Sequence, residues 1–262
     1  CSPTNIGAPF TITFPGGLVT RNGVVYTYNQ SSPFQLWSID TVTGVHTLVF
    51  NMTGVPQTNF TGMTWDGTTM YGVSSSITVS QIFTVNMTTG VCTPIGAPSA
   101  TCAGAIFLAG RNLVGAGLFS VDILLDNLYK WNKTTGVATL VGPLGGNANF
   151  GQDGQFDNAD GKLYWMSYIT GPALRTIDTA TGSGVQLCTY LAQATGIAPV
   201  TISAGPSILP ELMYYKFEQN PSAGLVQNCA QTPVGTNPAP LLSTTPLGSG
   251  GQFDSCLSGQ VT

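Results

Sequence analysis

The sequence predicts an all-β fold made from copies of one four-stranded unit, followed by a C-terminal segment that lacks the repeat. Two observations predict it: a motif that recurs at a fixed interval, and short apolar strands separated by tight turns within each interval. Four Thr-Gly pairs stand 46 residues apart, with no insertion or deletion: Thr43-Gly44, Thr89-Gly90, Thr135-Gly136 and Thr181-Gly182. A fixed period of this length makes the chain an array of one supersecondary unit.

Each interval contains four short strands joined by tight turns. The second copy has the hairpin turns Asp66-Gly67 and Thr89-Gly90, and its expected strands are 60–65, 69–75, 81–87 and 91–95. The first copy repeats this pattern over 18–20, 24–28, 35–40 and 45–50. In the fourth copy the turn Asp160-Gly161 precedes a strand over 162–168. No stretch has a sustained period of 3.6 residues, so very little helix is expected.

Four antiparallel strands in about 40–50 residues make one blade of a β-propeller. The run Leu36-Trp37-Ser38-Ile39-Asp40, leading to Thr43-Gly44 and then to Val45-His46-Thr47-Leu48-Val49, resembles the blades of secreted repeat propellers. It lacks the Gly-His and Trp-Asp pairs of WD40 blades. The resemblance covers about residues 10–208 and concerns architecture rather than activity.

The number of blades follows from the number of copies. Four units are clear, and a degenerate fifth is expected within 194–208, where residues 196–200 imitate an inner strand. Residues 10–14 could supply a missing outer strand. A five-bladed ring over residues 1–209 is the prediction, and the alternative is an incomplete ring that another chain completes.

Residues 210–262 lose the repeat and are rich in Pro, Gly, Ser and Thr. Two stretches, 212–218 and 251–257, resemble the opening strands of a laminin-G/concanavalin-like sandwich, a domain that needs far more residues than remain. We therefore expect a truncated sandwich, a small disulfide-stapled appendage, or an arm that packs on another subunit. Tyr214, Tyr215 and Phe217 are too apolar for a free tail, so the segment is expected to dock.

The composition excludes several partners. Only 7% of the 262 residues are charged and the net charge is −4, whereas about 25% is usual in soluble domains. With no basic patch, nucleic acid is not an expected partner. No apolar run reaches the ~18 residues of a membrane span. A surface so poor in charge is weakly protected against association, so glycans or neighbouring subunits are expected to cover it.

The chain has six cysteines and a single histidine, which favours disulfides in an oxidising compartment over a zinc site. Six cysteines allow 15 pairings. The preferred set is Cys92–Cys102 across a loop between repeats, Cys229–Cys256 within the tail, and Cys1–Cys188. Cys1 is interpreted as a processed terminus, and a bacterial lipoprotein is the alternative.

Five Asn-x-Ser/Thr sequons are also consistent with an extracellular or cell-surface protein. They begin at Asn29, Asn51, Asn59, Asn86 and Asn132. Asn86 and Asn132 occupy the same place in the repeat as Asp40 and Asp178, just before the Thr-Gly turn. Asn and Asp at this place also serve a plain turn role. We expect N-linked glycans on at least two of the five.

The sequence offers few catalytic groups. The only histidine, His46, falls on a fourth strand, where an edge residue is expected rather than a base, and no Gly-x-Ser-x-Gly elbow is present. Both glutamates, Glu211 and Glu218, lie in the tail, so no glycosidase pair is marked. The four tryptophans stand out of register in the repeats, which favours blade packing over a repeated sugar platform. No catalytic residue is predicted.

One acidic loop is a weak candidate for calcium, because oxygen-rich loops bind that ion. It contains Asp153, Asp157 and Asp160, although the hairpin Asp160-Gly161 explains part of it. Otherwise neither metal nor cofactor is expected.

These observations predict a non-catalytic extracellular glycoprotein with a structural or adhesive role. We expect a homopolymer, a fibre or a surface layer, that assembles through the C-terminal arm. The alternatives are a monomeric carbohydrate- or protein-binding propeller and, less favoured, a secreted hydrolase or lyase.

Overall fold

The structure is a computed structural model, and it describes residues 6, 7, 12, 15–111, 113, 115–190 and 196–199, together with four short strands after residue 224. The chain separates into two compact units, residues 1–200 and 201–262, whereas the sequence predicted a boundary after residue 209. No helix in the described part of the chain is long and apolar enough to cross a membrane.

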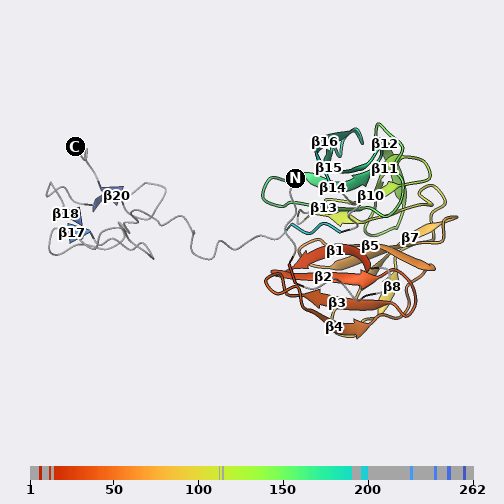
Figure 1. The fold of residues 1–262 in the computed structure, drawn as a ribbon, viewed down its shortest axis with the longest axis horizontal. Helices are drawn as coiled ribbons and strands as arrows, with labels where there is room; N and C mark the ends of the chain where they lie inside the picture. Colours follow the sequence, from red (N-terminus) through yellow and green to blue (C-terminus); the bar gives the residue numbers. More distant parts are fainter. Residues whose placement is uncertain are drawn as a thin grey trace. The chain divides into compact units, whose positions relative to one another are not determined.

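Residues of the first unit form four sheets, each with four antiparallel strands paired in chain order (Figure 1). The first blade contains β1 (Pro15–Arg21), β2 (Val24–Asn29), β3 (Gln35–Ile39) and β4 (His46–Asn51). The second contains β5 (Asn59–Trp65), β6 (Met70–Ser75), β7 (Ser80–Val85) and β8 (Cys92–Pro94). The third contains β9 (Ala109–Gly110), β10 (Leu118–Asp122), β11 (Asn127–Trp131) and β12 (Ala138–Pro143). The fourth contains β13 (Asp153–Phe156), β14 (Leu163–Tyr168), β15 (Pro172–Ile177) and β16 (Gly184–Thr189).

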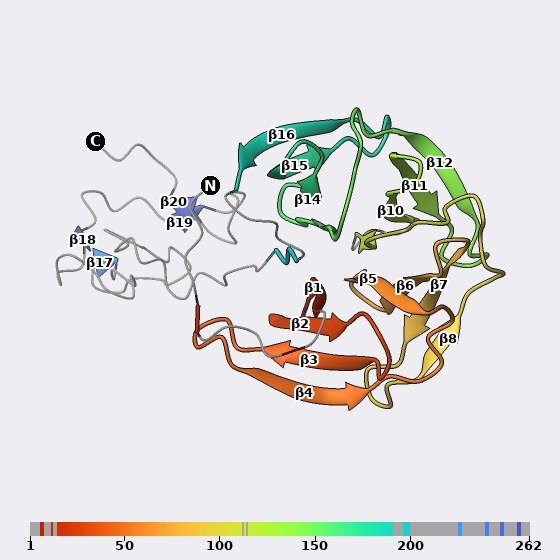
Figure 2. The same cartoon turned by 45° about the vertical axis from the view of Figure 1, so that its right-hand side comes forward.

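The sheets follow one another around a common axis as propeller blades (Figure 2). Their first strands line the axis: β1 contacts β5, β5 contacts β9, β9 contacts β13, and β13 contacts β1. The predicted all-β propeller with four clear blades is therefore confirmed. In the segment expected to hold a degenerate fifth blade, residues 196–199 form no strand, and the rest lies outside the described residues. Of residues 10–14, which could supply an outer strand, only residue 12 is described.

The Thr-Gly pairs form the predicted hairpin between the third and fourth strands of each blade. Their glycines have φ between 70° and 84°, a left-handed conformation that suits glycine. Four residues earlier, Asp40 uses its carboxylate to accept hydrogen bonds from the N–H groups of Val42 and Thr43. Asn86 and Asn132 accept the equivalent pair of bonds through their side-chain oxygens. The same local chemistry thus shapes the turn whether the residue is Asp or Asn.

Each turn also lies against the backbone of the preceding segment, at a distance that leaves no room for a side chain. A Cβ on Gly96 would lie 2.0 Å from the carbonyl oxygen of Thr135, and one on Gly142 would lie 2.1 Å from that of Thr181. The first turn has no preceding blade, and it meets Ile6 and Gly7 instead. Because the turns of the second, third and fourth blades must each reach the preceding blade at this close contact, an insertion in the unit would misplace them.

Three apolar clusters fill the space between consecutive blades. The first joins the first and second blades around Tyr28 and Phe60, whose rings stack with centroids 4.1 Å apart. The second joins the second and third blades around Ile82 and Trp131. The third joins the third and fourth blades and includes Trp165. No comparable cluster of described residues joins the fourth blade to the first.

In the second unit β17 (Leu225–Val226) pairs with β18 (Ala239–Pro240), and β19 (Leu247–Gly248) pairs with β20 (Cys256–Leu257). The strand expected over 251–257 thus overlaps β20, while 212–218 lies outside the described residues. The resemblance to a laminin-G domain remains a prediction.

Candidate functional site

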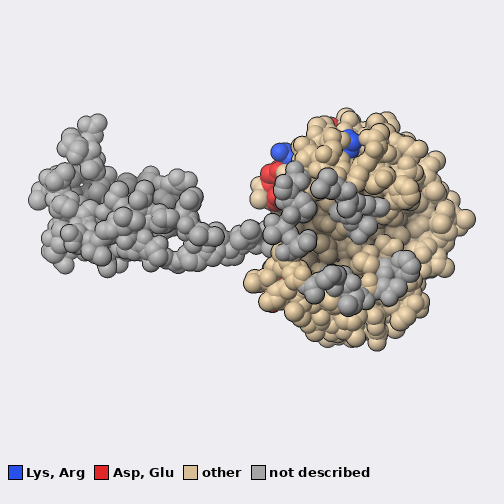
Figure 3. Space-filling view, in the orientation of Figure 1, with Lys and Arg blue, Asp and Glu red and all other residues tan. Residues whose placement is uncertain are grey.

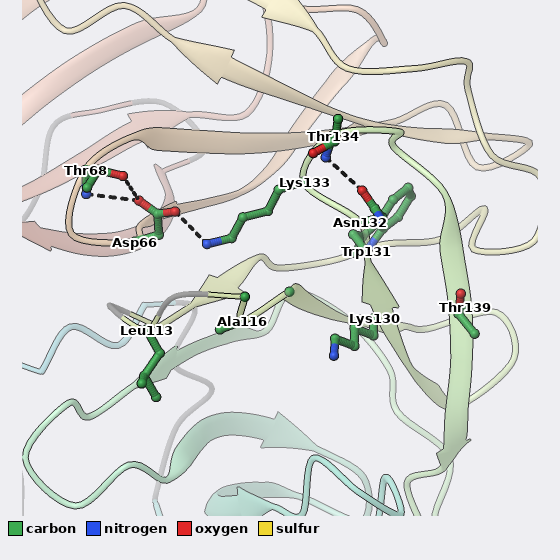
Figure 4. Close-up of a pocket in the computed structure, with 12 residues that line it drawn as sticks. Asp66, Thr68, Leu113, Ala116, Lys130, Trp131, Asn132, Lys133, Thr134 and Thr139 are labelled. Carbon is green, nitrogen blue, oxygen red and sulfur yellow. Dashed lines mark hydrogen bonds and ion pairs between the residues drawn. The ribbon is translucent and has the colours of Figure 1, made fainter.

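A pocket of about 610 Å³ opens at the junction of the second and third blades (Figure 4). Asp66 and Thr68, in the turn between β5 and β6, form one wall. The end of β11 and the turn after it form another, from Lys130 to Thr134. Leu113 and residues 115–117, which precede β10, close a third side.

An ion pair between the two blades lies within this pocket. The ammonium group of Lys133 is 2.5 Å from Oδ2 of Asp66, and Oδ1 of Asp66 accepts hydrogen bonds from the N–H groups of Thr68 and Thr69 and from the Thr68 hydroxyl (Figure 4). Burial acts to raise the pKa of Asp66, but the Lys133 ammonium and these hydrogen bonds outweigh it and lower that pKa below its ordinary value. The carboxylate is therefore ionised in neutral solution, and both of its oxygens have partners within the protein.

Sequence reasoning missed this site. Asp66 was predicted only as a hairpin residue, and its partner stands 67 positions along the chain. One signal was available: Lys130 and Lys133 are two of only four lysines in the protein and lie three residues apart.

The three carboxylates proposed for calcium do not form one site. Asp153 begins β13 and is buried, accepting hydrogen bonds from the N–H groups of Leu18, Gly154 and Ile197. Asp157 and Asp160 lie in the turn after β13, where each accepts a local N–H, and Asp160 also pairs with Lys162. Within the described residues no group of three metal-binding side chains is found. The Asp153 side chain joins backbone segments of the first and fourth blades, and calcium binding by this loop stays a prediction.

The sequons differ in what their asparagines do. Asn86 and Asn132 are exposed, and their amide nitrogens have no hydrogen-bond partner among the described residues, because only the side-chain oxygen serves the turn. Their hydroxyl residues Thr88 and Thr134 are also exposed. Asn51, on the outer strand β4, is exposed as well, and its oxygen accepts a hydrogen bond from Gln35.

The other two sequons are engaged in the fold. Asn29 is 8% exposed, and its amide donates to the carbonyls of Ser31 and Pro33 while its oxygen accepts from the N–H of Gln35. The amide of Asn59 donates to the carbonyl of Ser75, and the hydroxyl of Thr61 in the same sequon is buried against Val73. A glycan on Asn29 would replace one of the two amide N–H donors and so remove the hydrogen bond to Ser31 or to Pro33.

The predicted bond between Cys92 and Cys102 is not formed. Both thiols are free and buried, and they lie in different cores: Cys92 between the first and second blades, Cys102 between the second and third. Burial raises the pKa of the Cys92 thiol to about 12. Cys188 is disulfide-bonded, as predicted for that residue. Cys1 and Cys229 lie outside the described residues, and only the strand placement of Cys256 is described.

The histidine and the tryptophans have packing roles. His46 begins the outer strand β4 and lies edge-on to Trp37, with ring centroids 5.8 Å apart. Trp131 and Trp165 are fully buried in the cores between blades. The predicted role of these two tryptophans in blade packing is confirmed.

No protein-family model and no curated protein matches the chain. Among solved structures it is similar to a nidogen/laminin complex, with 16% identity and a TM-score of 0.50 over 66% of this chain and 64% of that one. A Bacteroides thetaiotaomicron protein of unknown function has 19% identity and a TM-score of 0.48, over 67% of this chain and 43% of that one. The Malassezia sympodialis allergen Mala s 1 has 13% identity and a TM-score of 0.48, over 72% of this chain and 69% of that one. This chain thus spans less than two thirds of the length of the nidogen/laminin chain and of the Bacteroides protein. At these sequence identities the likeness concerns the fold alone.

Proposed function

We propose that this protein is a non-catalytic extracellular glycoprotein with a structural or adhesive role, whose copies assemble into a fibre or surface layer through the C-terminal arm, residues 210–262. The observation that carries the proposal is that the boundaries between consecutive blades differ in the kind of contact that joins them. Three boundaries have an apolar core, whereas the described contact between the fourth and first blades is polar, through Asp153 and Leu18. A neighbouring chain that packs at this boundary would complete it.

The blades on either side of this boundary support an interface. Their outer strands are edge strands, with backbone groups that another strand can pair. On β4, Leu48 and Val49 are each 41% exposed, and on β16, Val185 and Leu187 are 60% and 51% exposed. Charged side chains keep edges apart in monomeric proteins. They make up only 7% of this chain, and few of them are visible on the face that Figure 3 shows. An apolar arm from a second copy would find both hydrogen bonds and apolar contacts there.

Exposed sequons support the glycoprotein part of the proposal. Asn86 and Asn132 stand at equivalent turns, and their amide nitrogens have no hydrogen-bond partner among the described residues. Glycans there would cover a rim that has little charge of its own. The non-catalytic part rests on His46, the only histidine, which packs on Trp37 at the outer edge. It also rests on Asp66 and Asp153, whose carboxylates are committed to structural contacts.

A second candidate is a propeller that binds a ligand as a monomer. The pocket beside Asp66 and Lys133 favours it, since its volume falls in the range of small-molecule sites.

The test is the state of assembly of the full chain, measured by size-exclusion chromatography and negative-stain imaging. We expect polymers, their loss on deletion of residues 210–262, and weaker assembly in Leu187→Lys. Ile77→Lys is the matched control, because Ile77 is 64% exposed but lies in the turn between β6 and β7. A monomer at all concentrations would contradict the proposal, as would equal effects of the two lysine substitutions.

A further inference from the structure

The pocket between the second and third blades carries an unbalanced positive charge. Asp66 and Lys133 neutralise each other in their ion pair. Lys130 also lines the pocket and has no carboxylate partner among the described residues. In a chain whose net charge is −4, this pocket therefore attracts rather than repels an anion.

Lys130 is an exposed residue, and its side chain contacts two residues of the third blade. Its stem lies against Gly117, where a Cβ would come within 2.6 Å of the Lys130 Cε atom. Its ammonium group lies 5.9 Å from the centre of the Phe119 ring. A glycine at position 117 thus leaves the space that the lysine occupies, and the aromatic ring supports its charge.

The rest of the pocket suits a polyhydroxylated ligand better than an inorganic ion. A volume of about 610 Å³ is far larger than such an ion needs. Thr134 and Thr139 line it with hydroxyls that have no hydrogen-bond partner in the described part of the chain, and Lys133 uses only one of its three N–H donors on Asp66. Leu113 and Ala116 supply an apolar side. One anionic group, several hydroxyls and an apolar face are the features of an acidic sugar.

We propose that this pocket binds a carboxylate-bearing saccharide unit, with Lys130 as the group that pairs with the carboxylate. Lys133 and the threonine hydroxyls contact the sugar hydroxyls, and Leu113 and Ala116 contact its C–H face. This goes beyond the proposed structural role and does not depend on assembly, because all of the lining residues belong to one chain. In an assembled protein the same pocket would attach each subunit to an acidic polysaccharide.

Isothermal titration calorimetry tests the proposal with the full-length protein and three acidic probes: trigalacturonate, a glucuronate-containing disaccharide and sialyllactose. The fully methyl-esterified trigalacturonate is the neutral counterpart of the first. At least one acid should bind at millimolar concentration or below, more weakly as salt is added. Lys130→Gln should lower that affinity roughly tenfold or more, since the positive charge that pairs with the carboxylate is lost. Lys162→Gln is the matched control, because Lys162 is an exposed lysine on another blade.

Asn132 stands at the edge of the pocket, so binding is measured before and after enzymatic removal of N-glycans. The proposal is overturned if no acidic probe binds in either form, if the methyl ester binds as well as the acid, or if Lys130→Gln binds like the unchanged protein. It is also overturned if inorganic sulfate competes at concentrations equal to those of the saccharide, which would indicate a general anion site. The unfolding temperature of Lys130→Gln must match that of Lys162→Gln. A loss of binding can then be assigned to the missing ammonium group and not to unfolding of the protein.

Discussion

The N–H group of Leu18 donates a 2.8 Å hydrogen bond to the buried carboxylate of Asp153, which joins the first blade to the fourth. The same oxygen accepts the N–H of Ile197, and the other oxygen accepts the N–H of Gly154. One side chain thus connects three backbone segments at the boundary where the described residues form no apolar core.

Asp153 should make stability depend on pH. Burial raises its pKa to about 8 from an ordinary value of 3.8, although the three N–H donors favour the ionised form. Between these values the folded protein holds a proton that the unfolded chain has lost. Its contribution to stability is therefore fully present below about pH 4 and falls as the pH rises to about 8.

The measurement is the unfolding temperature by circular dichroism from about pH 5 to about pH 8. Asp153→Asn cannot titrate, so its unfolding temperature should fall less over this range than that of the unchanged protein. The substitution itself should cost about 1 kcal/mol, since the amide retains only one acceptor oxygen. Parallel curves for the two proteins would contradict the prediction.

Gly142→Ala should destabilise the contact between the third and fourth blades. The added Cβ would lie 2.1 Å from the carbonyl oxygen of Thr181, and Gly142 does not have a positive φ, so the cost comes from the contact itself. We expect a loss of about 1–3 kcal/mol in the free energy of unfolding by denaturant titration. Gly23→Asn is the control, because position 23 has nothing within 4 Å and asparagine tolerates its φ of 80°. Equal losses at the two positions would show that the turn contact is unimportant.

Glycan occupancy should follow exposure of the asparagines. Secreted from a eukaryotic host, the protein should carry glycans at Asn86 and Asn132 and none at Asn29 or Asn59, by glycopeptide mass spectrometry. Asp40→Asn combined with Val42→Thr builds a sequon at the equivalent turn of the first blade, where Val42 is 85% exposed, and should add one glycan. Occupancy of Asn29 in folded protein would refute the assignment, whereas an absence of glycans at every sequon would argue against a glycoprotein altogether.

The thiols of Cys92 and Cys102 should be free but unreactive in the folded protein. Both are buried in cores, and burial raises the pKa of each thiol, so little thiolate forms in neutral solution. Iodoacetamide should modify both only after unfolding without reductant, while Cys188 stays unmodified. Peptide mapping decides between the alternatives: a peptide linking Cys92 to Cys102 would restore the bond expected from sequence.

The local elements were predictable because they depend on neighbouring residues. The second copy was expected over 60–65, 69–75, 81–87 and 91–95, and its strands run from Asn59 to Trp65, Met70 to Ser75, Ser80 to Val85 and Cys92 to Pro94. The turn after Asp66 and the Thr-Gly hairpins were likewise placed correctly. Strands and turns are recognised from apolar–polar alternation and from glycine at positions of positive φ, and both signals lie within a few residues.

Long-range partnership was not predictable. Cys92 and Cys102 are close in sequence, yet the structure places them in different cores. The sequence placed Asp153 in an acidic loop and Asp66 in a simple hairpin, because no local pattern pairs Asp153 with Leu18 or Asp66 with Lys133.

The repeated blade, its strands and its turns can be read from the amino-acid sequence, because strand alternation and turn chemistry act over a few residues. Which of several chemically similar groups are accessible depends on how the chain packs. Asn86 and Asn29 are both sequon asparagines, but one has a free amide at a turn and the other is buried in hydrogen bonds. Burial and hydrogen bonding depend on how blades pack against one another, and the repeat marks that packing where Gly96 and Gly142 meet the Thr-Gly turn of the next blade.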